Sequence, residues 1–434
     1  MNIAQVWNVP EIQRRLKFVG FALLIFVIGT HIPTPGISQS LITGFFGQAS
    51  GGAAGGLFGL LDLFTGGALR KFSVLALGVM PYINASILMQ ILVAIEPRLK
   101  EIQQEGEEGR KLISKYTRYL AIFFAFLQGA GLVFSMQGGP LSPDYEGLLK
   151  VVAPLTALLC VVAGTCFLMW LGDEITQKGV GNGISLIIFI GIVARVPGEV
   201  ATELMQAQFE QTRWSAILLF AVFLVLIVLG IVFIQLSVRK IPIQYARRQV
   251  GRKIYGGQST FLPIKVAMAG VIPIIFAVSL LMIPPTLLSF MPQWSVGNAL
   301  WGRFNNSIWY LVGEWGLVFL FTFIYTAITF NTKEISDNLK KHGGFIPGIR
   351  PGKPTFDFLD KVLHRVTFFG GVFLATVAVL PIIVNHLVFE ITQVQIQTFY
   401  IGGTSLLIVV GVALDTVQQL QAHMVMRHYS GFTK

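Results

Sequence analysis

Stretches of apolar residues recur along the whole chain, separated by shorter polar and charged stretches. Most are close to the length of about 20 residues that an apolar helix needs to cross a bilayer. The pattern therefore predicts an all-α polytopic membrane protein with ten transmembrane helices. The expected spans are 17–33, 73–95, 116–136, 151–171, 184–204, 215–237, 264–289, 310–330, 366–388 and 399–420. The fifth is the least regular, because Pro197 interrupts it and polar residues follow.

The composition agrees with a membrane protein. Of the 434 residues, 54% are hydrophobic and 12% are charged, about half the charged fraction of a soluble domain. The first apolar run follows Arg14, Arg15 and Lys17 and lacks a small-residue cleavage site, so we expect a retained span rather than a signal peptide. Cys160 and Cys166 are six residues apart and face different sides of a helix, so neither a disulfide nor a metal pair is predicted.

The basic residues are distributed unevenly between the two sides of the membrane. With the N-terminus inside, 26 of the 32 Lys and Arg lie in cytoplasmic segments. Because basic residues accumulate on the cytoplasmic side, this split supports ten spans with both termini in the cytoplasm. The exceptions, on the opposite side, are Arg70, Lys71, Lys150, Arg195, Arg213 and Arg303.

Ten spans divide into two groups of five. A unit with an odd number of spans that is repeated once must be inverted relative to its copy. We therefore expect an N-terminal half, 1–213, and a C-terminal half, 214–434, with a central pathway at the seam. No residue-level repeat is evident, so this expectation rests on topology.

The predicted spans are almost free of charged residues. Asp415 is the one clear acid inside a span, where a helix-packing role is favoured over a functional polar contact. A secondary transporter with inverted repeats, the main alternative class, would carry polar or charged residues that converge at mid-membrane. An intramembrane enzyme would need paired catalytic residues, and HExxH and GxSxG motifs are absent. The sequence predicts no enzyme activity, cofactor or metal site.

Two long segments on the predicted cytoplasmic side, 238–264 and 331–365, carry many basic residues and are punctuated by glycine and proline. The tendency of basic residues to lie inside explains their charge but not their length. We therefore favour a docking surface for ribosomal RNA phosphates or for an acidic protein face.

Residues 51–71 contain seven glycines around a short apolar core. The core is too short to span a bilayer and too apolar for an exposed linker.

Four motifs carry a family resemblance. LGDEITQKGVGNGISLIIF (171–189), YARRQVGRKIYGGQSTFLPIKVAMAGVIPIIFA (245–277), NLKKHGGFIPGIRPG (338–352) and GGTSLLIVVGVALD (402–415) resemble signatures of the SecY family. The resemblance covers essentially the full chain, in order. It departs at Thr332, where the family usually has proline. Members are the main subunits of channels that translocate unfolded preproteins and release transmembrane segments laterally into the bacterial plasma membrane.

The resemblance implies an hourglass pore with a ring of aliphatic residues at its waist. Each residue taken alone also fits an ordinary lipid-facing or core position. By motif position the ring is Val79, Ile83, Ile184, Ile188, Val271, Ile275 and Ile408.

The resemblance also implies a plug and a lateral gate. The plug is a short re-entrant helix at about 56–71 that fills the outer funnel, with glycine hinges and with Asp62 facing water. Its core is Leu57, Phe58, Leu60, Leu61, Asp62, Leu63 and Phe64. Spans two and seven border the gate, where Pro81 and Pro273 are expected to kink them. Asn84 and Asn182 either hold the gate shut by hydrogen bonds or serve ordinary helix–helix contacts.

The implied partners are the small subunits SecE and SecG, the motor ATPase SecA, the ribosome, signal peptides, preproteins and membrane lipids. Energy comes from the ribosome or the motor, because the channel itself is passive. The implied docking residues are Arg247, Arg248, Arg252, Lys253, Arg350 and the tail residue Tyr429.

Overall fold

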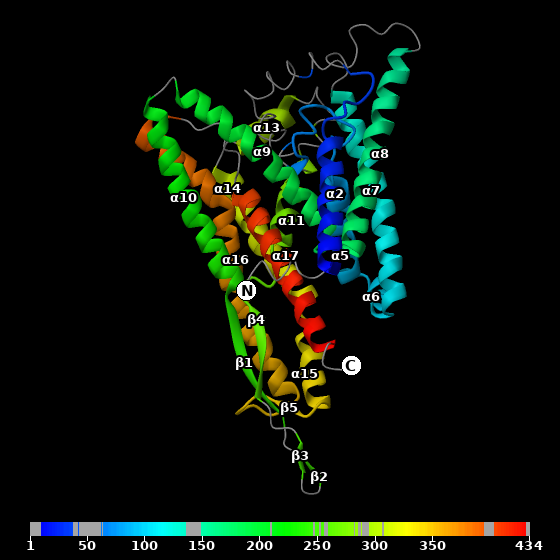
Figure 1. The fold of residues 1–434 in the computed structure, drawn as a ribbon, viewed down its shortest axis with the longest axis vertical. Coiled ribbons are helices and arrows are strands. Elements are labelled where there is room, and N and C mark those ends of the chain that lie inside the picture. The colour runs from blue at the N-terminus through cyan, green and yellow to red at the C-terminus, as the bar shows by residue number, and fades with distance from the viewer. Residues whose placement is uncertain are drawn as a thin grey trace.

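The computed structural model describes residues 10–37, 42, 62, 64–135, 149–208, 211–245, 248–250, 253–255, 259–281, 283–284, 288, 295–305, 308–394 and 403–430. The described part is a helical bundle from which a β hairpin projects at one end (Figure 1). In the first half the helices are α2 (Pro10–Gly29), α5 (Met80–Ile95), α6 (Pro97–Gln104), α7 (Glu107–Ser135), α8 (Leu149–Lys178) and α9 (Gly183–Ala207). In the second half they are α10 (Gln211–Leu236), α11 (Ile272–Leu281), α13 (Ser295–Asn305), α14 (Ile308–Thr329), α15 (Thr332–Lys341), α16 (Lys353–Thr392) and α17 (Gly403–Ser430).

Each predicted span corresponds to a helix. Within the described part of the chain, seven helices are long and apolar enough to cross a membrane, namely α7, α8, α9, α10, α14, α16 and α17. The other three are α2, whose first half is charged, and the shorter apolar helices α5 and α11. The fifth span is a continuous helix in which Pro197 lies without ending it.

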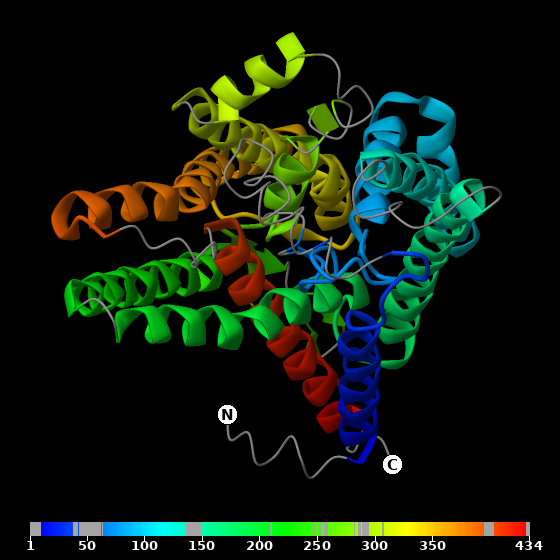
Figure 2. The ribbon, with the colours of Figure 1, turned by 90° about the horizontal axis from the view of Figure 1, so that it is seen from above.

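The two halves repeat one pattern of helix contacts. α7 packs against α5 and α8, just as α14 packs against α11 and α16. α2 contacts α8 and α9, just as α10 contacts α16 and α17. The halves meet where α5 contacts α11 and where α9 contacts α10 and α17, as the view along the bundle shows (Figure 2). Together with the contacts within each half, this arrangement surrounds a central region.

A residue-level repeat, which was not recognised from the sequence, precedes the helices of the second and seventh spans, α5 and α11. Both helices follow turns that contain a left-handed glycine, Gly78 with φ 57° and Gly270 with φ 58°. In each case valine follows this glycine, and the helix begins at the next residue. A turn of this shape requires positive φ, which glycine adopts without steric cost.

A close helix crossing is repeated in the same two places. A Cβ at Gly164 of α8 would lie 1.9 Å from the carbonyl oxygen of Val74, and a Cβ at Gly370 of α16 would lie 2.3 Å from that of Val266. Val74 and Val266 each stand four residues before the left-handed glycine of their turn. Only glycine permits such an approach of helix to backbone.

The prolines of these two spans have a different role from the one expected. Pro81 occupies the first turn of α5, and Pro273 is the second residue of α11. Proline in the first turn removes no helical hydrogen bond, because the amide groups there lack intrahelical acceptors. The prediction of kinks was therefore wrong, and the two spans are shortened instead by the turns before them.

The two segments predicted as cytoplasmic docking loops fold together. β1 (Val238–Tyr245) pairs antiparallel with β4 (Ser259–Lys265) and with the short β5 (Gly344–Phe345), giving the order β4-β1-β5. β2 (Arg248–Val250) and β3 (Lys253–Tyr255) form a second hairpin at the tip. A separate apolar cluster joins the strands to the first turns of α16, through Ile241, Ile264, Ile346, Leu359 and Leu363.

The segment 331–365 is thus largely helical. Asn331 accepts a hydrogen bond from the amide of Glu334 and caps α15, so Thr332 is the first helical residue. Proline, the usual family residue there, also suits the first position of a helix. The departure at Thr332 is therefore compatible with the same local structure.

Candidate functional site

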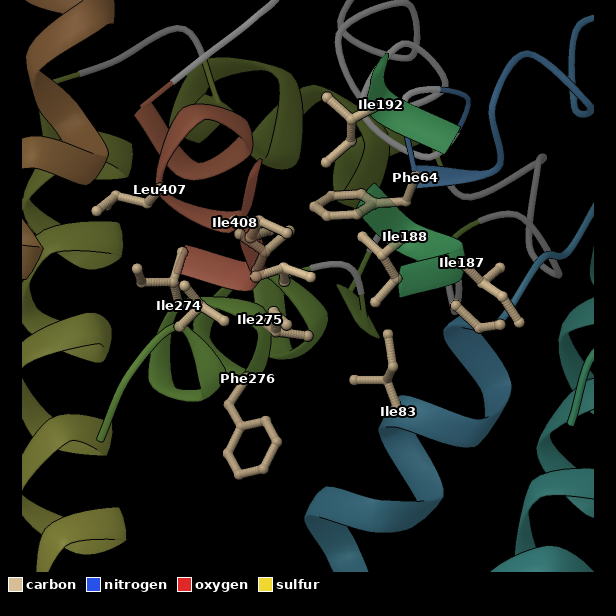
Figure 3. Packing of buried hydrophobic residues seen from close by; sticks show 14 of the residues in the cluster. Phe64, Ile83, Ile187, Ile188, Ile192, Ile274, Ile275, Phe276, Leu407 and Ile408 are labelled. Atoms are coloured by element: carbon tan, nitrogen blue, oxygen red, sulfur yellow. The ribbon is translucent and has the colours of Figure 1, made fainter. Parts of the chain in front are cut away.

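An apolar cluster fills the region where the two halves meet. Ile83 of α5, Ile188 of α9, Ile275 of α11 and Ile408 of α17 are at most 7% exposed and belong to this cluster. Their side chains face one another around one centre, as the close-up shows (Figure 3). Four helices, two from each half, therefore converge on one point.

The neighbours of these residues in sequence point elsewhere. Ile187, Ile274, Phe276 and Leu407 are equally apolar, but their side chains are directed away from the centre (Figure 3). Since successive helix residues differ by about 100° in direction, only one face of each helix reaches the centre. The sequence alone does not distinguish Ile274 from Ile275.

The other predicted ring residues lie in or against the same cluster. Val79 and Val271 are 1% and 4% exposed, and each immediately precedes the helix that carries Ile83 or Ile275. Ile184 stands four residues before Ile188 and is half-buried against the cluster. Residues four apart share one helix face, which explains the spacing of these pairs. The structure thus brings all seven predicted ring residues together.

An aliphatic constriction has two chemical consequences. It offers water no hydrogen bonds, so it disfavours a continuous water column and resists ions. It also offers a passing polypeptide no specific hydrogen bonds, so chains of many sequences can slide through it.

The described part of the Gly-rich stretch packs into the same apolar cluster. Phe64 is 2% exposed, belongs to the same cluster, and lies beside Ile192 and Ile408 (Figure 3). Of the predicted plug core, only Asp62 and Phe64 are among the described residues; the others, which lie outside them, are Leu57, Phe58, Leu60, Leu61 and Leu63. We call the described residues 62 and 64–72 the plug base.

The prediction that Asp62 faces water was wrong. Its side chain is 0% exposed and lies 3.2 Å from both Arg70 and Arg195. Burial raises the pKa of Asp62, and the two guanidinium groups oppose that change. A charge pattern along the sequence cannot reveal this pairing, because Arg195 is 133 positions away on α9.

The predicted gate helices α5 and α11 contact each other. The two asparagines predicted at the gate, Asn84 and Asn182, have different surroundings. Asn182 is the N-cap of α9, and its side-chain oxygen accepts hydrogen bonds from the amides of Ile184 and Ser185. Asn182 thus caps its own helix, a role that neither the gate prediction nor the helix–helix alternative anticipated. Asn84 is half-buried on α5, and its side chain forms no hydrogen bond with a described residue.

Four of the predicted docking residues are among the described residues, and Arg248, Lys253 and Arg350 lie at the end of the molecule that carries the hairpin. Arg350 is exposed, and its carbonyl oxygen accepts a hydrogen bond of 2.8 Å from the Thr355 hydroxyl. The backbones of Arg248 and Lys253 lie in β2 and β3, and that of Tyr429 lies near the end of α17. Arg247 and Arg252 lie outside the described residues.

The expectation that Asp415 is the one clear acid inside a span was wrong, because Glu199 and Glu203 lie within the fifth span and Glu314 within the eighth. A charged stripe on α9 was also overlooked among the candidate functional residues. Arg195, Glu199 and Glu203 follow one another at four-residue intervals along α9 and are largely buried. Arg70, Arg195 and Arg213 are three of the six basic residues that the predicted topology places outside the cytoplasmic segments. Each forms an ion pair with a buried acid. These arginines lie on the side of the membrane where the predicted topology expects few basic residues, and this departure could have identified them from the sequence.

Comparisons with known proteins agree with this architecture. The SecY family model matches residues 73–417. A protein translocase subunit SecY of Thermotoga maritima is 44% identical over 99% of this chain and 96% of its own length. One from Mycobacterium bovis is 40% identical over 98% of this chain and 97% of its own length.

Solved structures share the fold. A structure described as that of a protein-conducting channel has a TM-score of 0.63 at 18% identity and covers 98% of both chains. The Sec61 channel in a canine ribosome–channel complex has a TM-score of 0.58 at 16% identity, over 98% of this chain and 97% of its own.

The repeated halves of five spans, their helices of membrane-spanning length and the shared fold define a multi-pass membrane protein built like the solved protein-conducting channel. The matching family model and the relatives of full length place the chain more narrowly. It belongs to the SecY family.

Proposed function

We propose that this chain is the pore through which unfolded preproteins cross the bacterial plasma membrane and from which transmembrane segments pass sideways into lipid. The observation that carries the proposal is the convergence of aliphatic side chains from four helices at the junction of the halves. The segments 1–213 and 214–434 are the two inverted halves, and both termini lie in the cytoplasm. Lateral release occurs between α5 and α11, which contact each other across the seam.

The pore is passive, and its partners supply the energy for transport. SecE and SecG are the small membrane subunits, and SecA and the ribosome dock on the β1–β4 hairpin and the segment around Arg350. Support comes from the relatives, which carry the name of a translocase subunit, and from the ribosome-bound Sec61 neighbour. The exposed basic surface of this projecting unit is suited to phosphates and acidic partners.

The decisive experiment stalls a preprotein in the reconstituted channel. The chain is purified with SecE and SecG, reconstituted with active SecA and ATP, and given cargo that carries a bulky folded end. Single cysteines at Ile83, Ile275 or Ile408 are expected to crosslink to the stalled cargo, because they face the centre. Cysteines at Ile274 and Leu407 serve as matched controls, since their side chains point away. Equal labelling at both sets would contradict the ring.

Docking is tested separately by charge reversal. Arg350→Glu is expected to lower SecA- or ribosome-driven transport by about tenfold, because a repelled partner binds more weakly by about 1.4 kcal/mol or more. The amount of assembled complex should not change, since Arg350 is exposed. Arg303→Glu is the matched control, because it reverses the same charge at an exposed position of α13, away from the hairpin, and should leave transport unchanged. Normal transport by Arg350→Glu would exclude this residue from docking.

A further inference from the structure

The plug base is attached to α9 by buried charges. Asp62 Oδ2 lies 3.2 Å from Nη1 of Arg195, whose other nitrogen Nη2 lies 3.0 Å from Glu199 Oε1. The same Asp62 oxygen lies 3.2 Å from Nε of Arg70, and the Arg70 amide donates a 2.9 Å hydrogen bond to Oδ1. We call Asp62, Arg70, Arg195 and Glu199 the anchor network. It connects a segment between the first two spans to the fifth.

The backbone and the side chains of the same region fit α9 closely. Gly66 has φ 70°, and a Cβ there would lie 3.1 Å from the Cα of Gly191. Phe64 packs in the apolar cluster beside Ile192, one turn from the charged stripe (Figure 3). The plug base therefore rests on α9 through an apolar side chain, a glycine contact and an ion network.

The charges are arranged so that separation leaves no isolated ion. If the plug base leaves α9, Asp62 takes Arg70 with it, because both belong to the same short segment. Arg195 stays on α9 with Glu199, four residues along the same helix. Removing one partner of a buried ion pair is normally costly because the other charge is left uncompensated. Here both separated charges keep a counter-ion.

The contact between the two parts is also less directional than a hydrogen bond. Among the described residues, neither Asp62 Oδ2 nor Arg195 Nη1 has a hydrogen-bond partner, despite the 3.2 Å distance between them. The attraction across the interface is therefore mainly electrostatic. Glu199 opposes it twice, since it shares Arg195 with Asp62 and repels the Asp62 carboxylate.

We propose that the anchor network is a reversible latch: the Asp62–Arg195 pair holds the plug base on α9, and Glu199 sets how easily it is released. The proposal rests on the proposed channel function and on the plug role that the family resemblance implies, and it adds the residues that position the plug in the closed channel. Arg195 and Glu199 are positioning residues, because they act on the passage of ions and cargo only through the plug base.

Hydrogen exchange of the peptide covering residues 64–79 tests the latch directly in the purified complex with its small subunits. Asp62→Asn and Arg195→Gln are expected to increase exchange there by about tenfold, because each removes the Asp62–Arg195 attraction that holds the plug base on α9. Glu199→Gln is expected to slow exchange, because Arg195 then pairs with Asp62 alone. Arg195→Gln and Glu199→Gln each remove one charge from α9 but are expected to change the exchange rate in opposite directions. General destabilisation of the helix would increase exchange in both variants.

Arg213→Gln is the matched control, since it breaks the 3.1 Å pair with Glu203 between α9 and α10 and leaves the anchor network intact. Its exchange over 64–79 should equal that of the unmodified chain. The latch would be overturned if Glu199→Gln accelerated exchange, or if Asp62→Asn behaved as Arg213→Gln does. The double variant Asp62→Asn/Arg195→Gln should increase exchange by less than the two single effects combined, because each single change already removes the Asp62–Arg195 pair.

Channel conductance separates the latch from the plug itself. Deleting residues 56–67 is expected to increase ion leak in planar bilayers without abolishing transport. Unchanged conductance after the deletion would refute the plug role, whatever the exchange results. Increased leak after the deletion, with unaltered exchange in Asp62→Asn, would preserve the plug and refute the latch.

Discussion

Replacing Gly370 by alanine is expected to lower the free energy of unfolding by about 1–3 kcal/mol, the usual cost of forcing an extra methyl group into a packed core. The new Cβ would lie 2.3 Å from the carbonyl oxygen of Val266, which belongs to the turn before α11. Backbone cannot yield as a flexible side chain does, so α16 and the turn must separate. The remaining folded fraction after heating, measured by size-exclusion chromatography, should decrease.

Gly164→Ala should have a similar or larger effect, because its Cβ would approach the Val74 carbonyl to 1.9 Å in the corresponding place of the other half. Gly316→Ala is the control, since its Cβ would meet nothing within 4 Å and alanine favours a helix. Equal stability of all three variants would contradict the close crossing. A large effect in only one half would argue against structural equivalence of the halves.

Asparagine at Ile275 or Ile408 is expected to increase ion leak through the resting channel by about tenfold or more. The reason is hydration: an amide at the constriction bonds to water, and lowering the barrier for an ion by about 1.4 kcal/mol gives a tenfold rate. Both side chains face the centre in the structure (Figure 3). Single-channel recording of the reconstituted complex without cargo provides the measurement.

Ile274→Asn is the matched control for this prediction. Ile274 is 0% exposed but points away from the centre, so the change should destabilise the fold without opening a path for ions. Conductance is therefore compared per folded complex, as judged by size-exclusion chromatography. Leak from Ile274→Asn equal to that from Ile275→Asn would mean that loosened packing, and not polarity at the constriction, admits ions.

The sequence predicts structure correctly where a property, such as membrane-spanning length, belongs to a continuous stretch of residues. Every predicted span contains a helix, because a helix in lipid must satisfy its backbone internally and must be apolar along its length. It failed where backbone geometry matters within a stretch. The apolar pattern of 264–289 does not show that 259–265 form a strand and that α11 begins only at Ile272. Likewise, Pro81 lies in the first turn of a helix because the turn formed at the left-handed Gly78 ends just before that helix.

The candidate site divides in the same way. Motif positions indicated the seven ring residues, but only the packing of four helices from both halves decides that Ile275 faces the centre and Ile274 does not. The sequence by itself determined the spans, their number and the uneven distribution of charge, because these depend on transfer of local segments from water to lipid. Only the tertiary structure decided the crossings at Gly164 and Gly370 and the pairing of Asp62 with Arg195, because each joins residues far apart in the chain. Such contacts depend on distances in space, which local composition does not encode.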